Sequence, residues 1–204
     1  MDDWNAYKQI ITYMDQLHKD IGQLVLLIDQ LLAKELLHPV DSNRITRGLS
    51  SQTRKPYKWR IPYIRRAFVS NNEKQIRESI FYLIWLNQEA PFEFPTMICG
   101  RFQHEPLTEK RISDLMYKSY LTSLTTGGSK WRYSQDENGW TIATPTFDSR
   151  IQEFQGYILN LFDLKDRQVV AQNVTQPLSS GFNRRLSDFL TIPTYPFPVQ
   201  VPRE

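Results

Sequence analysis

The sequence predicts an α+β protein in which a long N-terminal amphipathic helix accompanies a largely antiparallel β-sheet with one or two further helices. Three observations lead to this prediction. Apolar residues recur at alternating intervals of three and four near the N-terminus, which is helical spacing. Later segments either alternate between apolar and polar residues or are apolar throughout, and both patterns are typical of strands. Finally, Asn138-Gly139 separates two aromatic-rich runs, a strong signal for a β-hairpin.

The first segment, residues 1–38, is predicted to be one helix that Asp2 or Asp3 caps and Pro39 ends. At 1.5 Å per residue such a helix is about 50 Å long, more than a compact domain of this size needs. We therefore expect part of its apolar stripe to contact another protein chain or a second copy of this one. The alternative is that the stripe lies on the sheet of its own domain. The predicted interface residues, called the seam below, are Ile11, Met14, Ile21, Val25, Ile28 and Leu32.

Positive charge is concentrated in one part of the chain. The formal net charge of the protein is +3, yet residues 41–80 alone have a net charge of +7. Residues 39–56 are predicted to be a polar basic loop. Residues 57–63 are predicted to be a strand that either lies at the edge of the sheet or breaks at Pro62.

We expect the basic segment 44–66 to attract an anionic partner, either single-stranded nucleic acid or an acidic protein surface. The alternative is that its charges form the solvated face of an edge strand, where lysine and arginine discourage pairing with other chains. The predicted binding residues are Arg54, Lys55, Lys58, Arg60, Arg65 and Arg66.

Residues 57–190 are predicted to form the α+β domain. Residues 76–87 are apolar on both faces, which favours a central strand, although a helix capped by Asn71 or Asn72 fits the same residues. The following run, "FEFPTMICGRF", completes a three-stranded meander.

The second half of this domain contains a predicted helix in "TEKRISDLMYKSYLTSLTTGG" and the hairpin around Asn138-Gly139. The run "GYILNLFDL" is predicted to be a strand, although the spacing of Ile151, Phe154, Ile158 and Phe162 also fits a helix. The run "DRQVVAQNV" fits a helix or a strand equally well. Residues 191–204 are rich in proline and are predicted to be an extended tail that packs by its aromatic rings or binds elsewhere.

Two carboxylates and a lysine at the ends of predicted strands form a candidate metal site. Asp148 follows the hairpin, and Asp163 and Lys165 end the next strand two residues apart, where they would share a face. This arrangement resembles the active-site motif of the PD-(D/E)xK nuclease superfamily. The resemblance implies that Asp148 and Asp163 hold Mg²⁺, that Lys165 assists the attacking water, and that Glu109 or Asp114 adds another acid. The alternative is an ordinary charged turn.

Other catalytic motifs are absent from the sequence. It has no glycine-rich phosphate loop and no serine in a nucleophile elbow, and its histidines and single cysteine lack zinc-ligand spacing. These absences favour a non-catalytic binding or assembly subunit without a cofactor over an enzyme. Because Cys99 is the only cysteine and the longest apolar run contains polar residues, we expect a cytoplasmic protein with no membrane-spanning segment.

Overall fold

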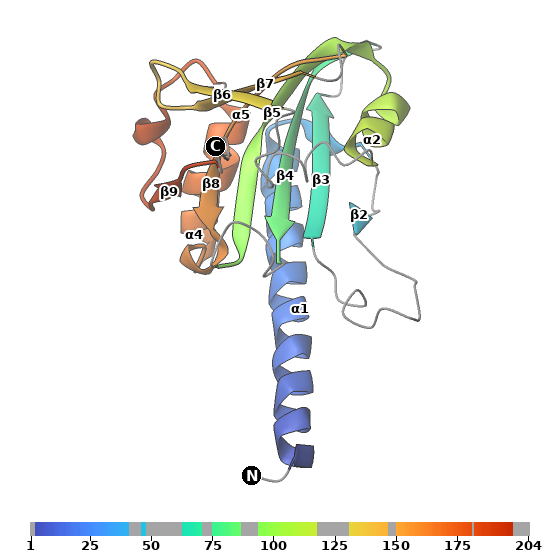
Figure 1. Ribbon diagram of the computed structural model, residues 1–204, viewed down its shortest axis with the longest axis vertical. Coiled ribbons are helices and arrows are strands. Elements are labelled where there is room, and N and C mark those ends of the chain that lie inside the picture. The colour runs from blue at the N-terminus through green and yellow to red at the C-terminus, as the bar shows by residue number, and fades with distance from the viewer. Residues whose placement is uncertain are drawn as a thin grey trace, which may run out of the picture.

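The computed structural model of the chain describes residues 3–40, 46–47, 63–70, 75–86, 94–117, 131–146, 150–180 and 182–197. These residues form a mixed α+β structure, as the sequence predicts. The long helix α1 (Asp3–Lys34) runs behind an antiparallel sheet and extends well below it (Figure 1).

The sheet contains nine strands among the described residues, in the order β1-β3-β4-β5-β8-β7-β6, with β2 paired to β3 and β9 to β8. Every pairing is antiparallel. The strands are β1 (Leu37–Pro39), β2 (Thr46–Arg47), β3 (Tyr63–Ser70), β4 (Ile76–Trp85), β5 (Thr96–Leu107), β6 (Trp131–Gln135), β7 (Thr141–Pro145), β8 (Ile151–Asn160) and β9 (Thr194–Tyr195). Strand β4 confirms the preference for a strand over a helix, and β4 and β5 are two of the three strands of the predicted meander. The third strand is β3, which begins where the predicted strand 57–63 ends; residues 57–62 lie outside the described residues.

Besides α1, the described helical segments are α2 (Glu109–Tyr117), η2 (Leu161–Asp163), α4 (Arg167–Val170), η3 (Ala171–Thr175), α5 (Gln176–Ser179) and η4 (Leu186–Asp188). Segments α4, η3 and α5 follow one another directly, so the ambiguous run "DRQVVAQNV" is helical. The Asp166 side chain begins this stretch, because it accepts hydrogen bonds from the backbone N–H groups of Gln168 and Val169.

Helix α1 ends at Lys34, earlier than the predicted boundary at residue 38. Leu36 adopts a left-handed backbone conformation with φ of 61°, which turns the chain out of the helix. The next three residues then pair with β3 as strand β1. The prediction missed this stop because Pro39 is a local signal, whereas the pairing that ends the helix joins segments distant in sequence.

The sheet is covered on both faces, so consecutive residues of a strand enter different cores. On one face, α1 and the helical stretch 167–179 cover the helix-side core, which includes Ile28, Leu32, Phe68, Tyr82, Cys99, Tyr157 and Val174. The core on the opposite face includes Phe81, Leu83, Ile98, Phe102, Ile112 and Phe154. As a result β3 has six consecutive buried residues and no exposed face between its ends.

A proline in the helical stretch 167–179 determines one hydrogen bond of the helix-side core. Pro177 has no N–H group, so it cannot bond to the carbonyl of Asn173 four residues earlier. The Tyr157 hydroxyl on β8 donates to that carbonyl over 2.8 Å. The Asn173 side chain, which is buried, accepts from the backbone N–H of Thr191 at 2.7 Å. The chain leading to β9 is therefore attached to this stretch, and Phe197, the last described residue of the predicted tail, is buried.

The β6–β7 turn confirms the predicted hairpin. Gly139 has a φ of 85°, a conformation that suits glycine. Asp136 stabilises the turn, because its Oδ1 accepts from the backbone N–H groups of Asn138 and Trp140 at 2.9 and 2.8 Å. Trp140 is fully buried and donates its indole N–H to the carbonyl of Arg184. The hairpin is thus joined to the segment that precedes η4.

Two glycines face each other in the centre of the sheet. Gly100 on β5 and Gly156 on β8 are cross-strand partners, and the ring of Phe154 lies over both. A Cβ atom at Gly156 would lie 2.3 Å from the Cys99 carbonyl oxygen and 2.4 Å from Cζ of Phe154. These positions therefore require glycine because the ring occupies the space of their side chains.

Candidate functional site

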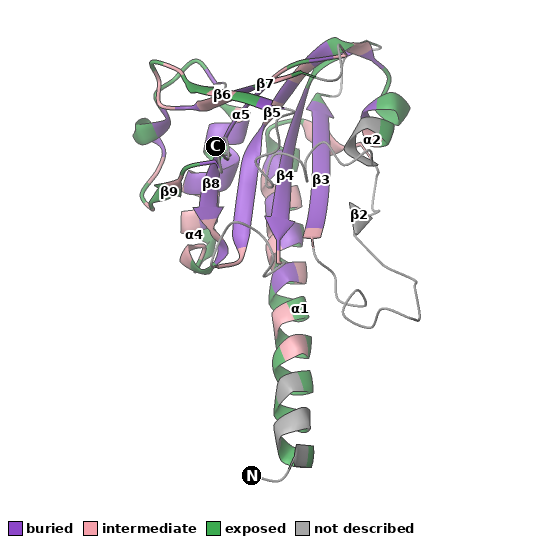
Figure 2. Cartoon of the chain, viewed as in Figure 1, coloured by how far each residue is buried: buried purple, intermediate pink, exposed green. Residues whose placement is uncertain are grey.

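Helix α1 has two halves with different surroundings. From Ile21 onward its seam is buried in the helix-side core: Ile21, Val25, Ile28 and Leu32 are between 0% and 4% exposed. Residues 4–20, which we call the arm, extend beyond the sheet, and their described side chains are exposed or half-buried (Figure 2). At 1.5 Å per residue the arm is about 25 Å long.

The arm carries apolar side chains that the described part of the protein leaves in solvent. Trp4, Ile11 and Tyr13 are 58%, 43% and 63% exposed, and Met14 is half-buried. Leu17, at the inner end of the arm, packs against the helix-side core. The Lys8 ammonium lies 5.2 Å from the centre of the Trp4 ring. Large apolar side chains grouped on one projecting element are typical of surfaces that bind another protein.

The structure corrects the predicted interface. Four of its six residues, Ile21, Val25, Ile28 and Leu32, belong to the core of this chain, so the prediction that they contact a partner is wrong. The physical reason is that the sheet needs a covering layer on this face, and the second half of α1 supplies it. Ile11 and Met14 precede the covered part and remain accessible.

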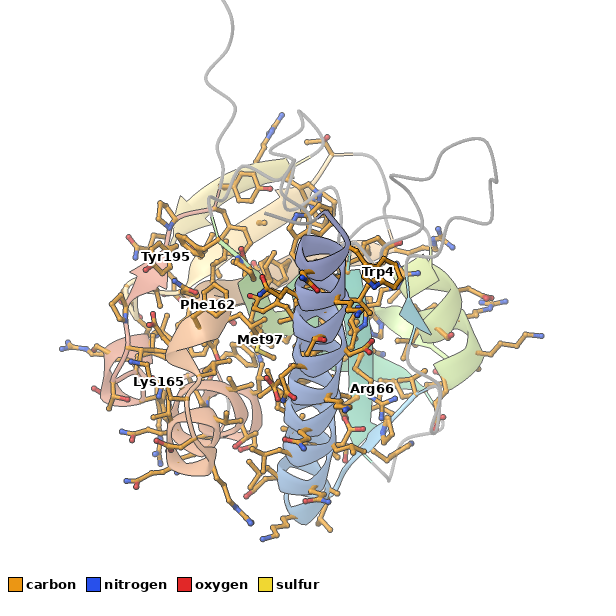
Figure 3. The ribbon with its side chains drawn as sticks, turned by 90° about the horizontal axis from the view of Figure 1, so that it is seen from below. Trp4, Arg66, Met97, Phe162, Lys165 and Tyr195 are labelled. Carbon is orange, nitrogen blue, oxygen red and sulfur yellow. The ribbon has the colours of Figure 1, made fainter. Side chains whose placement is uncertain are left out.

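A buried ion pair attaches α1 to the sheet. Arg66 on β3 points toward the helix and donates to both carboxylate oxygens of Asp29, from Nε at 3.1 Å and from NH2 (Figure 3). Only 4% of the Arg66 side chain is exposed. Burial raises the pKa of Asp29 above its ordinary value of 3.8, although Arg66 acts in the opposite direction. Burial also raises the pKa of the nearby Tyr82 hydroxyl, which stays neutral.

The positions of the two arginines of β3 do not fit the expectation that they attract an anionic partner. Arg66 holds Asp29, while Arg65 is 4% exposed on the opposite face, with its guanidinium carbon 5.6 Å from the centre of the Tyr63 ring. Neither offers an accessible charge to a partner, because β3 is covered on both sides. The other predicted residues, Arg54, Lys55, Lys58 and Arg60, lie outside the described residues, and their binding of nucleic acid or an acidic protein stays a prediction.

The Asp29–Arg66 pair leads to a pH-dependent prediction. Because the pKa of Asp29 is higher in the folded than in the unfolded chain, its contribution to stability is complete below about pH 3.8 and is lost as the pH rises through the folded-state pKa. The Asp29→Asn variant does not titrate at this position. We therefore expect the free energy of unfolding of the natural protein, relative to Asp29→Asn, to fall as the pH is raised from below 3.8 through the folded-state pKa.

Urea denaturation of both proteins across this pH range measures the difference, and Asp20→Asn on the arm is the control for the change of residue type. If the difference in the free energy of unfolding instead increases with pH, the attraction of Arg66 has a larger effect on the pKa of Asp29 than burial has.

The candidate nuclease site is not arranged as the resemblance implies. Asp163 and Lys165 do not end a strand: β8 stops at Asn160, whose side chain accepts from the backbone N–H of Phe162 and begins the 3₁₀ turn η2. The Lys165 backbone N–H bonds to the Asp163 carbonyl at 3.0 Å, and its side chain is exposed on the side of the molecule away from Arg66 (Figure 3). Asp148 lies outside the described residues.

The other acids expected near this site lie on α2. Glu109 contacts the His38 Nε2 of strand β1 at 3.0 Å, and Asp114 is exposed. Across the described ranges no three His, Cys, Asp or Glu side chains lie close enough together to hold a metal ion. The part of the site that is described therefore resembles a charged turn.

Cys99 is unsuited to nucleophilic chemistry. It is fully buried on β5, and burial raises the pKa of its thiol to about 12. A thiol with this pKa stays protonated at neutral pH, so Cys99 acts as a small core residue.

Two adjoining hollows that the sequence did not indicate lie between the β6–β7 turn and the chain that leads to β9. They have volumes of about 420 and about 680 Å³ and share Gly139, Leu186 and Thr194. Tyr133 lines the first, and burial raises the pKa of its hydroxyl to about 12. Their lining combines hydroxyl, aromatic, aliphatic and amide groups with the charged side chains of Glu137 and Arg185, and the described side chains form no cluster of metal ligands there.

Comparison with known proteins found no family model, no curated protein and no solved structure that matches this chain. Among the described helices, none has the length and apolar character needed to cross a membrane.

Proposed function

We propose that the protein is a non-catalytic binding or assembly subunit that contacts another protein chain through the arm. The observation that supports this proposal is the change along α1: the same seam that is buried beyond Ile21 continues onto the arm with Ile11 exposed and Met14 half-buried. A heptad seam is a surface on which a second helix packs, and here its first half is open.

The energetics of helices give a second reason. Most of the stability of a helix in a protein comes from burying an apolar face, and the arm has an apolar face that the described residues leave open. The arm extends about 25 Å from the sheet. A partner that covers Ile11 and Met14 would remove apolar surface from water, which is the main favourable contribution to protein association.

The proposal predicts that charged residues introduced into the seam of the arm abolish its contact with a partner chain without unfolding the protein. The double variant Ile11→Lys/Met14→Lys should keep the circular dichroism and melting temperature of the natural protein, because neither residue belongs to the core. It should lose either the larger mass seen by light scattering or a partner that the natural protein retains from an extract of its native host.

The matched control is Gln9→Lys/Gln16→Lys, which adds the same charge to exposed positions on the other side of the arm. It should keep the contact. If both double variants keep it, or both lose it equally, the seam is not the contact surface and the proposal fails.

A further inference from the structure

The covered half of α1 restricts how a second helix can lie on the arm. Ile11 and Met14 are on the same side of α1 as Ile21, Val25 and Ile28. Beyond Ile21 that side is occupied by the sheet. A helix lying along the arm can therefore continue past the N-terminal tip, but at the other end it meets the body of the protein.

We propose that the partner on the arm is the arm of a second copy of this chain, lying antiparallel to it. This inference rests on the proposed function and names its partner. In a parallel pair both bodies would be at the same end, and each sheet would occupy the place where the other helix continues. In an antiparallel pair the two bodies lie at opposite ends, so that each arm ends where the other protein's body begins.

The spacing of the seam fits this orientation. When Ile11 of one copy faces Met14 of the other, the reverse contact forms by symmetry, as a two-fold interface requires. The same register brings the N-terminal end of each arm, near Trp4, level with Ile21 of the other copy. The overlap then extends over the whole arm and stops where the covered half of the seam begins.

Charges on the arm complement each other in the same register. Lys8 and Asp15 are seven residues apart and both exposed, and both lie on one flank of the seam, because each is one position beyond a seam residue of the heptad. In an antiparallel pair this flank meets the same flank of the other helix. Lys8 of each copy then lies opposite Asp15 of the other, which gives two attractive pairs.

The size of the overlap predicts the strength of the dimer. About 25 Å of paired helix is only two to three heptads, and it buries less surface than the roughly 1,200–2,000 Å² of stable interfaces. We therefore expect a dimer that dissociates on dilution. Sedimentation equilibrium of the full chain over a wide concentration range measures its dissociation constant.

Exchange of the two charges tests the register. Lys8→Glu alone places two carboxylates opposite each other at both pairs, and Asp15→Lys alone does the same with two ammonium groups. Each single variant should raise the dissociation constant about tenfold. The double variant Lys8→Glu/Asp15→Lys restores attraction and should return the constant to near that of the natural protein. A double variant that dimerises no better than the single variants would overturn the inference.

Cross-linking tests the orientation independently. Lys8→Cys and Asp15→Cys proteins, one of them with an affinity tag, are mixed and treated with a short bis-maleimide; Cys99 is fully buried and does not compete. An antiparallel pair should give cross-links mainly between the two variants. Cross-links mainly within each variant would indicate a parallel pair and contradict the inference.

The outcomes separate this inference from the proposed function. If the protein is monomeric at every concentration but the Ile11→Lys/Met14→Lys variant loses a host partner, the inference that the partner is a second copy is wrong. The proposal that the arm is a contact surface then stands. A monomer that loses nothing in that variant overturns both. A dimer that responds to the charge exchange supports both.

Discussion

Replacing Leu32 by alanine is expected to lower the free energy of unfolding by about 2–5 kcal/mol, because a large buried side chain is removed and a cavity remains. Leu32 is 0% exposed and lies where α1 covers the sheet. The loss can be measured by urea denaturation followed by circular dichroism.

The same helix provides the control. Leu26 is 61% exposed, and Leu26→Ala removes the same atoms without leaving a cavity. Its effect should be within about 0.5 kcal/mol of zero. If Leu32→Ala and Leu26→Ala lower the free energy of unfolding by similar amounts, the second half of α1 is not packed on the sheet. The division of the helix into a covered half and an arm is then wrong.

Gly156→Ala is expected to destabilise the protein by at least about 1–3 kcal/mol, the usual cost of overpacking a core. The new methyl group would meet the Cys99 carbonyl oxygen and the Phe154 ring at 2.3 and 2.4 Å, and the carbonyl belongs to the neighbouring strand. Because backbone cannot move away as easily as a side chain, β5 and β8 would have to separate. Thermal or urea unfolding of the purified variant measures the effect.

Gly22→Ala is the matched control for this change. A Cβ atom at Gly22 would have no neighbouring atom within 4 Å, and Gly22 lies inside α1. Alanine should therefore stabilise the protein by about 0.5–1 kcal/mol, since it favours the helix. If alanine is tolerated at Gly156 as well as at Gly22, the close contact of Phe154 with β5 and β8 is not present in solution.

Elements with strong local patterns were predictable from the sequence. The regular spacing of α1 and the Asn138-Gly139 turn specify their structures from neighbouring residues alone, and the β-branched and aromatic residues of β4 favour a strand over the helix that also fits them. The run "DRQVVAQNV" stayed ambiguous because it is short and its helix depends on contacts with α1 and β8, which no local pattern contains.

The environment of the candidate residues was harder to predict than the elements. Arg65 and Arg66 appeared to belong to a charged surface, but Arg66 finds Asp29 on a helix 37 positions earlier in the chain. The sequence did contain a partial signal for this ion pair. Asp29 directly follows Ile28 of the seam, and a carboxylate that is partly buried beside the seam needs a partner. Asp163 and Lys165 were placed on a strand because the apolar pattern continues to Leu161 and Phe162, whereas Asn160 already caps a turn.

Gly22 lies at the point where α1 leaves the sheet, directly after Ile21, the first buried residue of the seam. Glycine has the greatest backbone freedom of any residue, so the helix is weakest against bending at this position, between its covered half and the arm. With an arm of about 25 Å, a bend of about 10° at Gly22 moves the distal end by about 4 Å. A small backbone change at this one residue would therefore shift the distal end of the arm by several ångströms, and Gly22→Ala, which favours the helix, would reduce that shift.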